Sequence, residues 1–204
     1  MEEFTPKLVG ARVKRREDQR LLTGQGAYVD DHHPPGMLYA AFLRSPYAHA
    51  RITQLDPSTA QTLEAVVAVV TGEELTHWVK PVRAASKMRE YKETSFPPLA
   101  IDKVRHVGEA VAVVVAESRY RAEDALEQIV VEYDPLPAVA DAEDAAKPGA
   151  PILHDEAGSN VLLSREFARG DVDAAVEMAA VRVRARFRFR RHAAVCMENR
   201  GCLA

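Results

Sequence analysis

The sequence predicts an α+β fold with mixed sheets and short helices, and two observations carry this prediction. Hydrophobic residues make up 47% of the 204 residues, which is enough to bury a core. Short runs of β-branched and aromatic residues predict strands, and capping side chains at helix-start positions predict short helices between them. No internal repeat accompanies these elements, so we expect a single irregular α+β arrangement rather than a repeat protein.

Charge and cysteine content narrow the class of protein. The formal net charge is -3 and the pI is near 6.2, so no overall attraction to nucleic acid is expected. Cys196 and Cys202 have no metal or redox spacing, and we expect two reduced thiols. Polar residues follow Arg15-Arg16, which argues against an export signal. The longest apolar run, 110–116, is too short to span a bilayer, so we expect a soluble, cytoplasmic protein without a membrane span.

The first predicted strands cover residues 37–44 and 49–55. Ser45-Pro46 separates them, and we expect the two strands to form an antiparallel pair across this break. A short helix should begin at Asp56-Pro57, and residues 65–70 read as a buried strand.

Further along, Thr71 to Glu74 has capping-box spacing, which predicts another short helix. Residues 80–98 have no clear period, and we expect a long loop there. The clearest unit is a strand at 110–116, a helix capped by Ser118 and a second strand at 129–133. This order predicts a crossover with parallel pairing, and it should form the core, with Val113 buried.

The last third of the chain begins with a Pro- and Ala-rich stretch at 134–151, which holds a small helix near 141–146. Gly170-Asp171 should begin a helix that runs to Met178. Residues 181–190 then alternate strictly: Phe187 and Phe189 share the apolar face, and five arginines share the other. The basic face lacks aromatic residues, so a solvated face, or one that meets carboxylates, is favoured over nucleic-acid binding.

Candidate chemistry is sparse. Asp30-Asp31-His32-His33 contains metal-ligand residue types, but sequential neighbours cannot easily all face one ion, so a solvated loop is favoured. His49, His106, His154 and His192 have no accompanying nucleophile motif, and we expect structural or interfacial roles for them. The residues alone therefore give an α+β domain without a self-contained catalytic constellation.

Several segments form an ordered series that runs from about residue 10 to the end of the chain. They are Gly10-Ala11 with Arg16 and Asp18, Leu21–Tyr28 with Asp30-Asp31, Gly36–Phe42, Arg44–Ile52, Pro98–Ala112, Ala122–Ala125, Val131–Pro137, Gly170–Ala175 and Met197–Gly201. Together they resemble the molybdenum-binding large subunits of the xanthine dehydrogenase, aldehyde oxidase and carbon monoxide dehydrogenase family. One departure is Asn199, which stands where many members carry proline.

The resemblance implies three parts. They are an N-terminal arm (1–17), an α/β-hammerhead domain (18–146), and a linker with the first helix and strand of an incomplete molybdenum-cofactor-binding domain (147–204). In the family, the pterin contacts and the catalytic glutamate lie downstream of the motif at 197–201. We therefore expect no catalytic, cofactor-binding or metal residue in this chain. The complete enzyme would hold a molybdenum–pterin cofactor, with iron–sulfur clusters and FAD on partner chains or domains.

The first hypothesis is thus the N-terminal portion of a molybdenum hydroxylase large subunit. The complete enzyme would hydroxylate an aldehyde, an N-heterocycle or a similar small substrate with water as the oxygen source. This portion would supply scaffold and subunit interface to the remaining molybdenum domain and to the iron–sulfur and flavin subunits. The residues expected to have structural or interface roles are Arg44, Ser45, His49, Phe187, Phe189, Glu198 and Arg200. The alternative is a stand-alone interaction module or a truncated, non-catalytic remnant.

Overall fold

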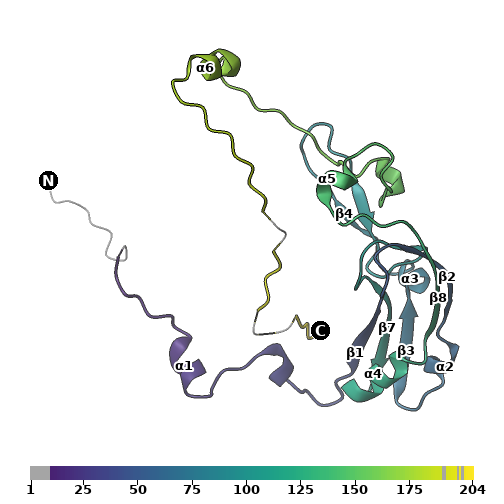
Figure 1. The fold of residues 1–204 in the computed structure, drawn as a ribbon. Coiled ribbons are helices and arrows are strands. Elements are labelled where there is room, and N and C mark those ends of the chain that lie inside the picture. Colours follow the sequence, from purple (N-terminus) through teal and green to yellow (C-terminus); the bar gives the residue numbers. More distant parts are fainter. Residues whose placement is uncertain (1–9, 190–191, 197, 199) are drawn as a thin grey trace. The chain divides into compact units, whose positions relative to one another are not determined.

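A computed structural model describes residues 10–189, 192–196, 198 and 200–204 of the chain (Figure 1). Contacts divide the chain into two units. One contains the residues up to Pro35 together with those from Arg184 onward, and the other is Gly36–Val183. All the strands belong to the second unit.

Two three-stranded sheets and one hairpin make up the strand content of the described residues. The first sheet has the order β1-β7-β3, from Tyr39–Arg44, Ala110–Ala116 and Val66–Thr71. The second has the order β6-β2-β8, from Lys103–Val104, Ala50–Asp56 and Val130–Pro135. The hairpin pairs β4 (Val82–Ala84) with β5 (Thr94–Phe96). The predicted α+β class is confirmed, with every described pairing antiparallel rather than mixed.

Two predicted pairings are wrong. β1 and β2 do not pair with each other, because Ser45-Pro46 carries the chain from the first sheet to the second instead of reversing it within one sheet. β7 and β8 are not a parallel pair either. β7 is the central strand, with both edges occupied by β1 and β3, so the chain after the helix joins β2 in the other sheet.

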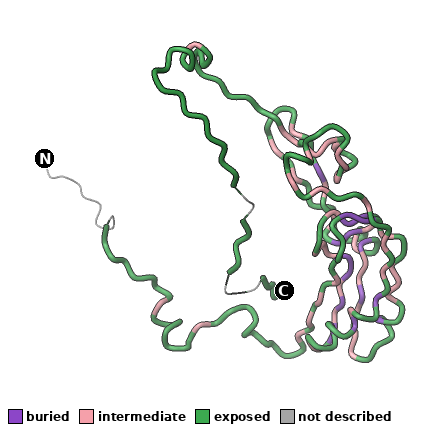
Figure 2. Tube along the Cα trace, in the orientation of Figure 1, coloured by how far each residue is buried: buried purple, intermediate pink, exposed green. Residues whose placement is uncertain are grey.

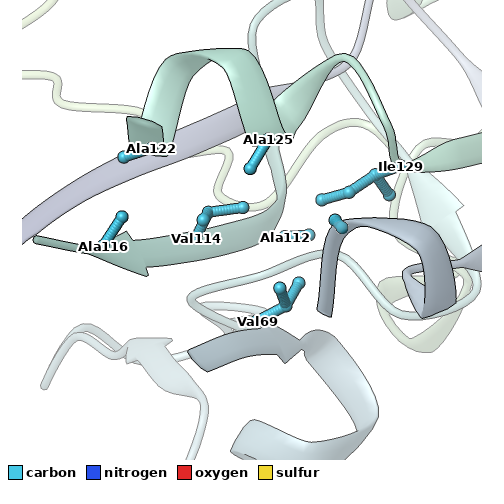
Figure 3. Close-up of a cluster of buried hydrophobic side chains, with 8 residues drawn as sticks. Val69, Ala112, Val114, Ala116, Ala122, Ala125 and Ile129 are labelled. Carbon is cyan, nitrogen blue, oxygen red and sulfur yellow. The ribbon is translucent and has the colours of Figure 1, made fainter. Parts of the chain in front are cut away.

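Small side chains let helix α4 (Arg119–Leu126) lie close against β7. Ser118 caps it as predicted, accepting a hydrogen bond from the Arg121 N–H at 3.3 Å. Ala122 and Ala125 point toward the β7 side chains, and Val114 lies among them with no exposed surface (Figure 3). Each such buried valine contributes roughly 1.5–3 kcal/mol. A second cluster combines Ala50 and Val104 of the other sheet with Ala100 and with Val111 of β7.

The remaining helices are short, and several begin where the sequence predicts. Thr71 and Glu74 form the predicted capping box, and the Asp171 carboxylate accepts from the Ala174 N–H at 2.9 Å. These helices are α1 (Asp18–Leu22), α2 (Ser58–Gln61), α3 (Gly72–Leu75), α5 (Ala142–Ala145), α6 (Val172–Met178) and the 3-10 turns Val29–Asp31 and Asp155–Ala157. Among the described residues, no helix has the length and apolar character needed to cross a bilayer.

Two further expectations differ from the structure. The long loop predicted at 80–98 contains the β4–β5 hairpin. The strand predicted at 181–190 is absent over residues 181–189, and Arg190 lies outside the described residues. A strand needs a neighbour for its backbone N–H and C=O groups, and no described strand pairs with this segment. Figure 2 shows most of the buried residues in the two sheets and the elements packed against them, whereas 181–189 is exposed along its length.

Candidate functional site

The turn after β1 is fastened to the loop that precedes β7. The Arg44 guanidinium donates to the Gly108 carbonyl at 2.9 Å. Ser45 exchanges two backbone hydrogen bonds with this loop: its N–H donates to the Glu109 carbonyl at 2.9 Å, and its carbonyl accepts from the Gly108 N–H at 2.8 Å. The Ser45 hydroxyl is buried and accepts from the Tyr47 N–H at 3.0 Å. Arg44 and Ser45 therefore fix the direction in which the chain leaves the first sheet.

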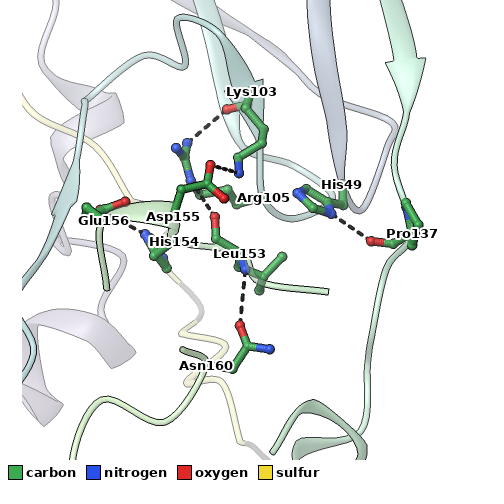
Figure 4. A network of polar contacts seen from close by, with 9 residues as sticks. All are labelled: His49, Lys103, Arg105, Pro137, Leu153, His154, Asp155, Glu156 and Asn160. Atoms are coloured by element: carbon green, nitrogen blue, oxygen red, sulfur yellow. Dashed lines mark hydrogen bonds and ion pairs between the residues drawn. The ribbon is translucent and has the colours of Figure 1, made fainter. Parts of the chain in front are cut away.

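His49 is buried at the start of β2, with 6% of its surface exposed. Its Nδ1 lies 2.7 Å from the Pro137 carbonyl (Figure 4), which requires Nδ1 to carry the proton. Its Nε2 is buried and has no hydrogen-bond partner among the described residues. The backbone carbonyl of His49 also accepts from the Leu136 N–H at 2.9 Å. A ring enclosed in this way holds the chain after β8 in place and is not presented to solvent.

Tyr133 lies close to this turn. Its ring centroid is 5.0 Å from that of Tyr47. Burial raises the pKa of the Tyr133 hydroxyl above 10.0, so it stays protonated at neutral pH. The contact between these two rings therefore joins the Ser45 to His49 connection to β8.

A lysine buried in the second sheet forms the main ion pair of this region. The Lys103 ammonium lies 2.7 Å from the Asp155 carboxylate (Figure 4). The pair is asymmetric, because the Lys103 side chain is 5% exposed and that of Asp155 is 77% exposed. The hydrogen bond from Lys103 lowers the pKa of Asp155 below its ordinary value of 3.8. Arg105 adds hydrogen bonds to the carbonyls of Leu153 at 3.2 Å and Lys103 at 3.0 Å.

These contacts hold residues 151–162, which we call the strap. Within the strap, the Asn160 side chain accepts from the Leu153 N–H at 3.1 Å and donates to the carbonyls of Pro151 and Ala145. His154 Nδ1 lies 3.4 Å from a Glu156 oxygen, but the two atoms do not have hydrogen-bond geometry. The two side chains form an ion pair when His154 is protonated. Polar contacts thus attach the strap to the sheet that carries Lys103.

Backbone N–H groups stabilise the charged form of Glu156 in the strap. Hydrogen bonds from its own N–H and from that of Ser95 lower the pKa of the Glu156 carboxyl below 4.5. The Ser95 N–H donates to this carboxylate at 3.3 Å. Glu156 therefore links the strap to β5 of the hairpin.

The other predicted residues lie in the unit that contains both ends of the chain. A Glu198 oxygen accepts from the Val29 N–H at 3.0 Å, at the start of the 3-10 turn. Phe187 and Phe189 are 80% and 90% exposed, and Arg200 is also exposed. The structure thus brings Arg44, Ser45 and His49 into one turn region, and does not bring the other four residues together into one site.

Neither the groove nor the metal-ligand residues of the described part of the chain indicate a catalytic site. A groove of about 190 Å³ has one carboxylate, Glu73, in its lining, which is otherwise Ile52, Thr53, Gln54, Leu55, Thr71, Gly72, Ala100 and Ile101. Among the described residues, no group of three or more His, Cys, Asp or Glu side chains is placed to hold a metal ion. Residues 30–33 are exposed, and Cys196 and Cys202 are exposed free thiols.

Sequence reasoning missed Lys103, Arg105, Asp155 and Asn160 as a connected set. Lys103 and Asp155 are separated by 52 positions. Local sequence patterns do not predict a contact over that separation. One available signal was a lysine two residues after the apolar run Leu99–Ile101 and directly before Val104. A lysine is seldom fully buried without a partner, so this position called for an acidic residue elsewhere.

The part of the chain built from the two antiparallel sheets, the helix on β7 and the fastened turns is the part that a known domain family matches. The family described as "Aldehyde oxidase and xanthine dehydrogenase, a/b hammerhead domain" matches residues 23–137. The chain therefore belongs to this family, and the predicted resemblance is confirmed.

Three known proteins show the extent of the similarity. The nicotine 6-hydroxylase large subunit of Paenarthrobacter nicotinovorans is 40% identical over 98% of this chain and 24% of that protein. Quinoline 2-oxidoreductase from Pseudomonas putida 86 has a TM-score of 0.76 and 43% identity over 82% of this chain and 21% of its own. The Cu,Mo-CO dehydrogenase in its carbon-monoxide-reduced state has a TM-score of 0.59 and 41% identity over 70% and 17%. The chain spans about a quarter of the length of the first of these relatives.

Proposed function

We propose that this chain is the N-terminal portion of the large subunit of a molybdenum hydroxylase, where it supplies scaffold and subunit interface. The observation that carries the proposal is the alignment of 98% of the chain to 24% of a hydroxylase large subunit at 40% identity. A match of that extent concerns the whole chain, including residues beyond the hammerhead.

The contacts of the predicted residues support structural roles. Arg44, Ser45 and His49 each direct a polar group at a backbone atom of the same unit, which orders the turns there. Phe187 and Phe189 expose an apolar face, which the rest of a large subunit would cover. In this proposal Glu198 fixes the turn at Val29, and Arg200, which is exposed, has a structural or interface role. The proposed organisation is arm 1–17, hammerhead 18–146, and linker with the start of the cofactor domain 147–204.

The proposed reaction of the complete enzyme is hydroxylation of a small substrate with water as the oxygen source. The names of two similar proteins refer to nicotine and quinoline, which favours an N-heterocycle over an aldehyde. The third name refers to molybdenum and copper. In this proposal the molybdenum–pterin cofactor binds to the rest of the subunit. In this proposal, iron–sulfur clusters and FAD belong to partner chains or domains, and the complex is cytoplasmic.

Purification of the tagged protein from its native host tests the proposal. We expect about one molybdenum per large subunit, together with iron and FAD, and incorporation of ¹⁸O from labelled water into a hydroxylated N-heterocycle. A stable 204-residue chain that carries neither molybdenum nor partner chains would contradict the proposal. That result would favour the alternative, an interaction module without a redox role.

A further inference from the structure

The hairpin region exposes an unusual number of large apolar side chains. Trp78 is 72% exposed and Val82 is 63% exposed. We define the basic hairpin as residues 78–96. Its exposed apolar side chains are Trp78, Val79, Val82, Met88 and Phe96, and its exposed basic side chains are Lys80, Arg83, Lys87, Arg89 and Lys92. Such a concentration within 19 positions is typical of an interaction surface rather than of scattered surface residues.

The fold of the basic hairpin holds two of its apolar side chains side by side. Val82 lies directly opposite Phe96 across the β4–β5 pair, so their side chains project from the same face. Trp78 and Val79 follow α3 and precede β4 by a few residues, which keeps them near this pair. Exposed apolar side chains therefore occur both on the β4–β5 pair and in the segment that leads into it.

The strap anchors the hairpin from one side. The Lys92 N–H donates to the Leu162 carbonyl at 2.9 Å, and the Ser95 N–H donates to Glu156. The Phe96 ring meets the His154 ring edge-on at 5.2 Å, and Thr94 is 2% exposed. A two-stranded hairpin alone is marginally stable in water, so these contacts fix its conformation before any partner arrives. A preformed surface loses less entropy on binding.

Charge indicates what kind of surface fits the basic hairpin. It contains five Lys and Arg residues against two glutamates, whereas the whole chain has a net charge of -3. Arg89 and Glu90 lie 3.8 Å apart, and both are exposed. A second copy of the chain would bring like charges together, which opposes self-association through this face. An acidic surface is attracted to it.

We infer that the basic hairpin is the docking surface for a second protein chain whose contacting face is acidic around an apolar centre. This inference rests on the proposed function, in which partner subunits bind the large subunit. A protein fits better than a nucleic acid because three of the five exposed apolar side chains are aliphatic or thioether groups, which do not stack with bases as aromatic rings do. Trp, Phe, Met and Arg are the residues enriched at the centres of protein interfaces.

The test uses the full-length large subunit co-expressed with its iron–sulfur and flavin chains. One variant, Trp78→Ser with Val82→Ser, removes apolar contacts, and a second, Arg83→Glu with Lys87→Glu, reverses charge. The matched control is Tyr120→Ser on α4, where the side chain is 78% exposed. Thermal melting checks folding, and bound partner chains are quantified by mass spectrometry after size-exclusion chromatography.

We expect the apolar variant to weaken partner binding at least tenfold and the charge variant to weaken it mainly at low salt, with molybdenum content unchanged. The control should bind like the wild type. Wild-type partner binding by both hairpin variants would overturn the docking surface while leaving the proposed function intact. Submicromolar binding of a fluorescein-labelled 20-nucleotide single-stranded DNA, lost in the charge variant, would replace the protein partner with a nucleic acid. Absence of both molybdenum and partners from the wild type would remove the proposed function and this inference together.

Discussion

Residues 110–116 and residues 181–189 both carry a regular apolar pattern, yet only the first segment is a buried strand. β7 lies between two other strands and beneath α4, and Val111 and Val114 have no exposed surface. No strand among the described residues pairs with 181–189, and Phe189 is 90% exposed. Alternation states which side chains would share a face, but neighbours decide whether the strand forms. Residues 181–189 thus have the side-chain pattern of a strand, but the described residues do not provide a sheet for them to join.

The largest expected effect on stability comes from making the same substitution in each of these two segments. Val114→Asp places a carboxylate among apolar side chains, and we expect a loss of about 4 kcal/mol in the free energy of unfolding. Val183→Asp makes the same change at a valine that is 87% exposed, and it should change stability by less than about 0.5 kcal/mol. Urea denaturation of both variants measures the difference. Similar losses at the two positions would remove the distinction between the segments. Val113, half-buried, is a weaker site for this test than the sequence predicts.

A smaller effect is expected at His49, on the folded side of the comparison. His49→Ala removes the hydrogen bond to Pro137 and leaves a cavity, which should cost about 2 kcal/mol. In the complete enzyme we expect less assembled protein, with a nearly unchanged rate constant per molybdenum. The measurement is the yield of cofactor-loaded complex alongside its turnover. A large fall in turnover with normal assembly would instead place His49 in the chemistry.

Apart from the controls, the smallest loss of stability is expected from a substitution in the Lys103–Asp155 pair. Asp155→Asn leaves a buried ammonium without its carboxylate, but Asp155 itself is exposed, so we expect a loss of about 1 kcal/mol. Asp173→Asn, on exposed α6, is the matched control and should have almost no effect.

The same pair predicts a pH dependence. The pKa of Asp155 is lower in the folded chain than its ordinary value of 3.8. Its contribution to stability is therefore fully present above that ordinary value and is lost as the pH falls through the folded pKa. Unfolding of the wild type and Asp155→Asn between pH 7 and pH 3 should show the difference between them shrinking at the acidic end. A difference that grows on acidification would contradict the assignment of the ion pair.

The sequence predicted helix starts well, because a helix cap depends on side chains close in sequence. The Thr71–Glu74 capping box, the Ser118 cap and the Asp171 cap each depend on side chains within three residues of the backbone group they satisfy. Strand pairing depends on distant segments, so the sequence could not show that Ser45-Pro46 connects two sheets. The contact between Lys103 and Asp155 was hidden for the same reason. The resemblance supplied the family, which the capping and periodicity signals alone did not define.

Hydrogen exchange on residues 181–189 tests the central claim most directly. The claim is that this segment becomes a strand only when the rest of a large subunit provides its neighbours. In a verified monomer of the 204-residue chain, we expect amides 181–189 to exchange nearly as fast as an unstructured peptide, while amides 111–116 stay protected. In the full-length large subunit, amides 181–189 should become protected. Strong protection of amides 181–189 in the monomer would contradict the claim.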